Sequence, residues 1–161
     1  MSAAVGPTKD ISIRVAQPFD RHQLAALSEA LWPESRAEEH LTHVAPILDR
    51  RDDSQLPVVF LVADAGNSQL VGFLETGLRS HADGCDSSHA VGYVEGWYVV
   101  EHFRGKGIGK RLMAAAEDWA RQQGCAEMAS DALIGNQGSQ FAHEALGYKE
   151  VDRCVHYRKA L

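Results

Sequence analysis

Apolar and polar residues alternate along this chain with two periods, one typical of strands and the other typical of helices. Runs of β-branched and aromatic residues bounded by turn signals predict strands at 11–15, 57–63, 70–78, 91–100, 127–131 and 148–157. Apolar residues three or four positions apart predict helices that end at Pro33, near Leu48, at Gly124 and at Gly147. Strands and helices are therefore expected to be mixed along the whole chain.

The order of these elements gives the expected fold class, α/β (α+β) with the order β-α-α-β-β-β-α-β-α-β. Ser35 and Glu38 form a candidate capping box for the second helix, which Pro46 is expected to bend or split. A chain of 161 residues can bury a substantial core, so 1–161 is expected to be a single domain with a loose leader at 1–10.

Composition narrows the class of protein. The chain is 45% hydrophobic and 24% charged, as in a soluble globular domain, and it has neither a membrane-spanning run nor the apolar core of a signal peptide near its start. A cytoplasmic location is therefore expected. Three separated cysteines and eight scattered histidines indicate neither a disulfide framework nor a metal site. The net charge of −6 argues against a nucleic-acid partner and is compatible with a cationic substrate.

A glycine-rich basic turn between the strand at 91–100 and the next helix carries the clearest chemical signal. Glycines let a backbone approach an anion closely, and a helix N-terminus adds partial positive charge. Gly105 and Gly109 are too close for a Walker loop, and the alternation of Gly105, Gly107 and Gly109 does not fit the dinucleotide fingerprint. The pattern that fits is Arg104-x-x-Gly107-x-Gly109. An ordinary basic turn is the alternative.

This spacing resembles the pyrophosphate-binding signature of the N-acetyltransferases of the GNAT superfamily, and the element order is also theirs. The resemblance implies a mixed central sheet whose fourth and fifth strands splay apart, with acetyl-coenzyme A as co-substrate in the gap and no metal. Two independent features of the sequence thus agree, which makes the ordinary-turn alternative the weaker one.

Further segments are similar to the aminoglycoside 6′-N-acetyltransferases. They span most of the chain after residue 30: Leu31-Trp32-Pro33, Gly84-Cys85-Asp86-Ser87-Ser88, Glu95-Gly96, 127–131, Asn136 with Ser139-Gln140, Ala145-Leu146-Gly147-Tyr148 and Tyr157-Arg158-Lys159. The resemblance implies acetyl transfer to the 6′-amine of an aminoglycoside antibiotic by direct attack in a ternary complex. It also implies antibiotic resistance and a homodimer.

Carried over by position, the resemblance assigns two sets of binding residues. The cofactor set contains the pantetheine strand, the pyrophosphate turn and one asparagine: Trp97, Tyr98, Val99, Arg104, Gly105, Lys106, Gly107, Ile108, Gly109, Lys110 and Asn136. The substrate set is Trp32, Asp83, Glu95, Asp131 and Asp152. Relatives often have a tyrosine in the loop before Gly84, where this chain reads Ser80-His81-Ala82-Asp83, so Asp83 is only a candidate substitute.

An aminoglycoside is a polycation, and its reacting amine must lose a proton before it attacks a thioester. Glu95 is the candidate base, because it is a charge within an otherwise apolar strand just before the cofactor-binding residues. Its alternative is a solvated strand residue. Asp131 is expected to bind a second ammonium of the substrate, and its alternative role is to cap a helix or turn. For Asp152 the alternative, an exposed charge on a strand, is the stronger one. Trp32 is equally compatible with covering a sugar ring and with a place in the core.

The leaving thiolate needs a proton or a dipole. His143 and Tyr157 are candidate catalytic acids, although His143 could equally be a helix-surface residue. Backbone N–H groups of Tyr98 or Val99 are the expected donors to the oxyanion.

Two other functions fit the same sequence. A GNAT enzyme could acetylate a polyamine, a lysine side chain or a peptide N-terminus instead, because an acidic cleft suits all of these. A module that only binds acetyl-coenzyme A is the non-enzymatic alternative, and the acidic residues on the acceptor side, Glu95 and Asp131, argue against it.

Overall fold

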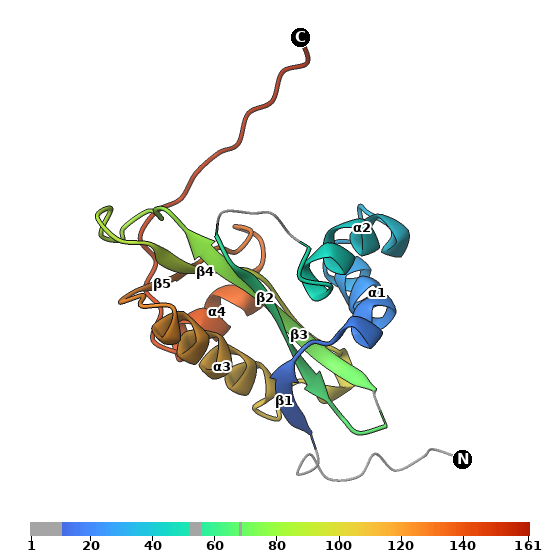
Figure 1. Ribbon diagram of the computed structural model, residues 1–161. Coiled ribbons are helices and arrows are strands. Elements are labelled where there is room, and N and C mark those ends of the chain that lie inside the picture. The colour runs from blue at the N-terminus through green and yellow to red at the C-terminus, as the bar shows by residue number, and fades with distance from the viewer. Residues whose placement is uncertain (1–10, 52–55, 68) are drawn as a thin grey trace.

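The computed structural model describes residues 11–51, 56–67 and 69–161, and its centre is a five-stranded sheet (Figure 1). The strands lie in chain order across the sheet: β1 (Ser12–Val15), β2 (Val58–Asp64), β3 (Leu70–Arg79), β4 (Val91–Val99) and β5 (Met128–Ser130). The helices are α1 (Arg21–Leu31), α2 (Ala37–Leu48), α3 (Ile108–Gln122) and α4 (Gln137–Ala145), with short 3-10 turns η2 (Pro18–Asp20) and η3 (Glu101–Phe103). The described elements form the expected mixture.

Helices cover both faces of the sheet, α1 and α2 on one and α3 and α4 on the other (Figure 1). Each layer has its own apolar core because successive strand residues point to opposite faces. On the α3 side, Leu74 and Val94 pack against Leu112. On the other side, Phe60 and Phe73 pack with Leu24 of α1. The sheet is therefore buried between two helical layers.

The sheet is mixed, and its parallel pair is short. Four strands run antiparallel to their neighbours, whereas β5 pairs with β4 in parallel after the α3 crossover. Only Gly92 to Val94 pair with Met128 to Ser130, so none of the described strands pairs with the rest of β4 on that side. This is the splayed pair that the resemblance implied, and the predicted fold class is confirmed.

A β-bulge interrupts β4 at Glu95. Glu75 of β3 pairs with Gly96, but the next β3 residue, Thr76, pairs with Val94, which leaves Glu95 as the extra residue. Bulges bend a strand and redirect a side chain, and they are common beside active sites. The bulge therefore places the Glu95 carboxylate at the point where β4 and β5 separate.

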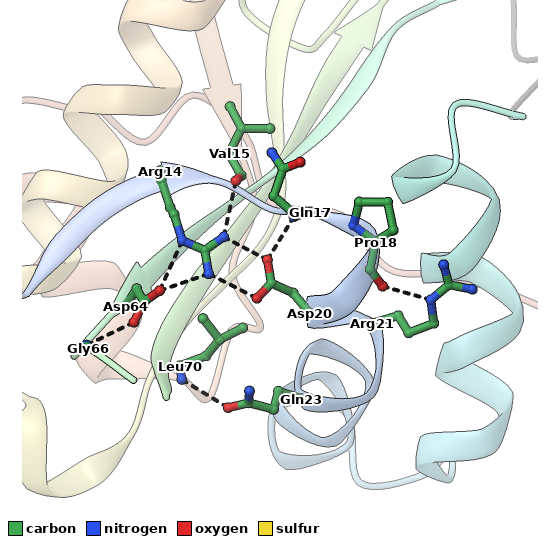
Figure 2. Close-up of polar contacts among 10 residues, drawn as sticks. All are labelled: Arg14, Val15, Gln17, Pro18, Asp20, Arg21, Gln23, Asp64, Gly66 and Leu70. Atoms are coloured by element: carbon green, nitrogen blue, oxygen red, sulfur yellow. Dashed lines mark hydrogen bonds and ion pairs between the residues drawn. The ribbon is translucent and has the colours of Figure 1, made fainter. Parts of the chain in front are cut away.

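A buried ion-pair network fixes the start of α1 to the sheet (Figure 2). Arg14 of β1 donates to both oxygens of Asp20, at 2.7 and 2.9 Å, and also to Asp64 of β2 at 2.8 Å. The Gln17 N–H donates to Asp20 as well. Asp20 is fully buried, and these bonds satisfy its charge.

Two local predictions were wrong. The N-cap of α2 is Arg36 rather than Ser35, because Glu29 of α1 accepts from the first N–H of the helix, that of Ala37. Of the two effects expected of Pro46, the split is wrong, because α2 continues to Leu48, and the bend stays a prediction.

The predicted last strand, 148–157, is not formed: within the part of the chain that the structure describes, these residues pair with no other strand. Residues 149–161 instead form an exposed extended segment, called the arm below, that leads away from the domain (Figure 1). The predicted leader 1–10 and part of the predicted loop at 49–55 lie outside the described residues.

Candidate active site

The glycine-rich turn has the geometry of an anion site. Gly105 and Gly107 have φ values of 71° and 78°, which favour glycine, and α3 begins immediately afterwards at Ile108. Among the described residues, no backbone carbonyl accepts from the N–H groups of Gly105 to Lys110. A side chain added at either positive-φ glycine would point into open space. The turn thus offers a row of free donors at a helix N-terminus, which fits a pyrophosphate.

Gly109 has a different role from the other two glycines. A Cβ there would lie 3.0 Å from the indole of Trp97, so its absence lets Trp97 pack beneath the first turn of α3. The Trp97 Nε1–H is buried and has no hydrogen-bond partner among the described residues. The Trp97 side chain therefore supports the turn. The predicted contact of its backbone with the pantetheine arm is a separate role.

The open edge of β4 presents a backbone donor near the gap. The Val100 N–H donates to Val71 of β3, and antiparallel ladders alternate, so the Val99 N–H points to the opposite edge, where β5 has already ended. Arg104 reaches this edge too, since its Nε donates to the Val99 carbonyl at 2.7 Å. Of the two predicted oxyanion donors, the geometry thus favours Val99 over Tyr98.

Glu95 and Asp131 each follow the last paired residue of their strand, Val94 of β4 and Ser130 of β5, and so lie where the two strands separate. Glu95 accepts two hydrogen bonds from Arg79, at 2.9 and 2.7 Å. The Glu95 carboxylate raises the pKa of Arg79, and Asp131 adds to this rise. Burial raises the pKa of the Tyr93 phenol to about 12, and the neighbouring Asp131 contributes to that shift too. The predicted acidic pair therefore shares one site with an arginine and a tyrosine.

Trp32 forms one wall beside this pair. A Cβ at Gly96 would overlap the Trp32 indole, so the ring lies directly on the β4 backbone next to Glu95. Trp32 also stacks on His40 and touches the core residue Phe73. Trp32 is thus half-buried: it packs against the core and also lies beside Glu95, where a substrate is expected.

His143 of α4 is held by hydrogen bonds on both ring nitrogens. Nδ1 lies 2.7 Å from the Ser139 carbonyl, which can only accept, so this nitrogen carries the proton. Nε2 lies 2.8 Å from the Ser130 hydroxyl and accepts from it in the neutral ring. The ring also packs edge-on against Trp97. His143 thus links α4 to β5, and its role as a catalytic acid stays a prediction.

The other predicted residues are spread more widely. Asn136 caps α4 by accepting from the Ser139 N–H. Asp83 is exposed in the loop after β3, where its charge adds to the burial that raises the pKa of the Cys85 thiol. Asp152 and Tyr157 lie in the arm and do not contact the acidic pair of their own chain. The assigned roles of these residues stay predictions.

The structure adds residues that the sequence reasoning missed. Arg79 is one of them, and Glu75 is another, a buried carboxylate on β3 that lies 2.6 Å from the His43 ring. Glu75 could have been found by the reasoning applied to Glu95, because it too is a charge inside an apolar strand. Arg79 gave no such signal, since it stands at a strand end next to a polar loop.

Comparison with known proteins decides the family. The sequence profile described as "Acetyltransferase (GNAT) family" matches residues 22–148. The chain belongs to the GNAT acetyltransferase family. Its match includes the glycine-rich turn, the acidic pair and His143, and the resemblance inferred from the sequence is confirmed.

Curated relatives within the GNAT family match nearly the whole chain. An aminoglycoside N(6′)-acetyltransferase type 1 from Klebsiella aerogenes is 36% identical over 149 residues, 92% of this chain and 96% of the relative. The protein of the same name from Serratia marcescens is 40% identical over 137 residues, 84% of this chain and 90% of the relative.

Solved GNAT structures agree with the sequence relatives. The aminoglycoside N-acetyltransferase AAC(6′)-Iy in complex with CoA is 34% identical, with a TM-score of 0.83 over 94% of this chain and 95% of that one. The same enzyme in complex with the bisubstrate analog CoA-S-monomethyl-acetylneamine gives a TM-score of 0.82, also at 34% identity, over 94% and 99% of the two chains.

None of the helices in 11–51, 56–67 and 69–161 is both long and apolar enough to cross a membrane. Over the same ranges, no three His, Cys, Asp or Glu side chains are grouped so that they could hold a metal ion.

Proposed function

We propose that this protein transfers the acetyl group of acetyl-coenzyme A to the 6′-amine of aminoglycoside antibiotics and thereby confers resistance to them. The observation that carries the proposal is the acidic pair Glu95 and Asp131 at the separation of β4 and β5, beside a turn of free backbone donors. Relatives named for this reaction match the chain over nearly its whole length, which supports the same acceptor.

The residues for the co-substrate are those of the turn and of the open β4 edge. Free N–H groups from Gly105 to Lys110 suit the pyrophosphate, and the β4 edge from Trp97 to Val99 suits the amide-rich pantetheine arm. Acetyl-coenzyme A supplies an activated acetyl thioester. The Val99 N–H is the donor that would stabilise negative charge developing on the thioester oxygen.

Glu95 acts on the acceptor. It accepts the proton of the substrate ammonium, directly or through one water, and the freed amine then attacks the thioester carbonyl. The tetrahedral intermediate collapses by breaking the C–S bond, and coenzyme A leaves as a thiolate that takes up the second proton lost by the amine nitrogen. Asp131 holds a second ammonium, and each charge-assisted bond of this kind contributes about 1.5–3 kcal/mol. Two such bonds distinguish a polyamino sugar from a neutral one.

A thiol-release assay tests both acceptor and base. Aminoglycosides with a 6′-amine should release coenzyme A thiol, and analogues with a 6′-hydroxyl should not. Glu95→Gln should lower kcat about 100-fold or more, while calorimetry finds the affinity for coenzyme A unchanged. Glu144→Gln, on the exposed side of α4, is the matched control and should behave as the wild type.

Two results would contradict this proposal. Preference for a basic peptide or a simple polyamine over every aminoglycoside would show that aminoglycosides are not the acceptors. Normal turnover by the Glu95→Gln variant would show that Glu95 is not the base.

We also propose a homodimer joined through the arm. Val151, Val155 and Tyr157 of the arm are 64%, 74% and 92% exposed, although such residues favour pairing in a sheet. The strand β5 is an edge with an unpaired side. Pairing of each arm with the β5 edge of a second copy would satisfy both. It would also take Asp152 and Tyr157 to the second copy, whose site they could then reach.

A cytoplasmic location is part of the same proposal. All three cysteines, Cys85, Cys125 and Cys154, are free thiols, as is usual in a reducing compartment. Burial raises the pKa of the Cys85 thiol, which makes it less reactive.

A further inference from the structure

The cation subsite beside Glu95 already contains a cation of the protein itself. Arg79 donates from Nε and Nη2 to the two oxygens of Glu95, at 2.9 and 2.7 Å. Its guanidinium carbon also lies 3.5 Å from the centre of the Tyr93 ring. Asp131 attracts the same guanidinium. Arg79 is thus held by a carboxylate and an aromatic face at once, and a second carboxylate adds to the field around it.

These are the groups that would bind a substrate ammonium. A carboxylate and an aromatic face are general partners for organic cations. Two cations cannot use both oxygens of Glu95 in the same geometry, and they would repel each other at that distance. The acceptor and Arg79 therefore compete for one subsite.

Arg79 is able to leave. Its side chain is 45% exposed, so the guanidinium can turn into water without opening the core. Glu95 is 34% exposed, and ion pairs at such partly exposed sites are weak enough to exchange. The β3 residue that pairs with Tyr93 is Gly77, two positions before Arg79. It has no side chain that could hold Arg79 against the Tyr93 ring.

We propose that Arg79 is an internal occupant of the acceptor subsite and that the substrate ammonium must displace it before Glu95 can accept a proton. Arg79 then sets which acceptors are bound. A polycation replaces the lost contacts with several of its own, whereas an acceptor with one amine cannot. This inference rests on the proposed function of Glu95 and Asp131.

Steady-state kinetics of Arg79→Gln give the first test. The KM for a 6′-amino aminoglycoside should fall about 2- to 5-fold, because the competing cation is gone, with kcat not reduced. A sugar with a single amine should gain more in kcat/KM than the aminoglycoside does. Arg121→Gln, on the exposed side of α3 and with the same change of charge, should leave all constants unchanged.

Arg79→Lys separates displacement from simple repulsion. Lysine keeps the charge but loses the two-pronged bond and the flat stacking on Tyr93. Displacement predicts a KM between those of the wild type and Arg79→Gln, and direct titration of the aminoglycoside into enzyme saturated with coenzyme A should show the same order of affinities.

The outcomes are distinct. An unchanged KM with a lower kcat in Arg79→Gln would show that Arg79 positions Glu95, and this would overturn the inference while leaving the proposed function intact. A wild-type KM in Arg79→Lys would overturn it as well. Absence of aminoglycoside acetylation by the wild-type enzyme would remove the proposed function, and the inference with it.

Discussion

At the scale of the residue, Gly107 shows how one backbone conformation links stability to cofactor binding. Its φ of 78° caps α3 in the left-handed region, where alanine costs about 1–2 kcal/mol. The added methyl group would also stand in the open space beside the free N–H groups. Gly107→Ala should therefore lower the melting temperature and raise the KM for acetyl-coenzyme A about tenfold.

Gly124 supplies the control for this prediction. It follows α3 at its other end, has a φ of 87° and faces open space, so Gly124→Ala carries the same backbone strain far from the turn. Its melting temperature should fall by a similar amount, with the KM unchanged. A rise of KM in both variants, or in neither, would contradict a role of Gly107 in the cofactor site.

The clearest site candidate in the sequence is a residue whose type conflicts with its surroundings. Glu95 stood out because a charge in an apolar strand needs a reason, and the bulge that redirects it is invisible in the sequence. Arg79 could not be predicted, because its importance comes from the β3–β4 register that brings it to Glu95. His143 was found as a candidate acid, but its bonds to Ser139 and Ser130 depend on the packing of α4.

At the scale of the element, the Arg14 network holds the start of α1 and thereby the Trp32 wall at its end. Removing the charge of the buried Asp20 leaves the partly buried Arg14 guanidinium with Asp64 as its one remaining carboxylate partner among the described residues. Asp20→Asn should cost about 2–4 kcal/mol of unfolding free energy and lower the melting temperature by about 5–15 °C. Asp118→Asn, an exposed pair with Arg121, should change it by less than about 1 kcal/mol.

The same network makes stability depend on pH. Burial alone would raise the pKa of Asp20, but the Arg14 guanidinium and the Gln17 N–H hold it below its ordinary value. A lowered pKa stabilises the fold above the unfolded-state pKa of about 3.9 and ceases to do so as pH falls through the folded-state value. The difference in stability between wild type and Asp20→Asn should therefore be constant near neutrality and shrink below about pH 4. Urea unfolding at several pH values measures it, and a constant difference down to pH 2.5 would contradict the assignment.

Element boundaries were predictable wherever hydrophobic period and turn residues agreed, as in α1, α3 and β2 to β4. The capping of α2 was not, because Glu29 on another helix takes the place of the local cap. The strand expected at 148–157 has the right residues, but a strand also requires a neighbour, and no period in the sequence shows whether one exists.

At the scale of the whole molecule, the arm is the part of the structure that a single chain does not explain. Three of its odd-numbered positions carry the apolar residues Val151, Val155 and Tyr157, with the charged Arg153 between the first two, whereas the even-numbered positions, such as His156, are mostly polar. Such alternation is what a strand buried on one face needs. In the proposed dimer, the apolar face of each arm packs against the second copy.

Adjacent substitutions on the two faces of the arm test this arrangement. Val155→Asp should turn the wild-type dimer into a species with the mass of one chain, 17.6 kDa, because it would bury a charge in the interface. His156→Asp adds the same residue on the other face and should leave the dimer intact. Light scattering after size exclusion measures both. Since Val155 is 74% exposed in the single chain, the melting temperature of monomeric Val155→Asp should fall only by the loss of dimer linkage, and it should become independent of protein concentration. A monomeric wild type, or equal dissociation by the two variants, would show that the arm does not pair with a second copy.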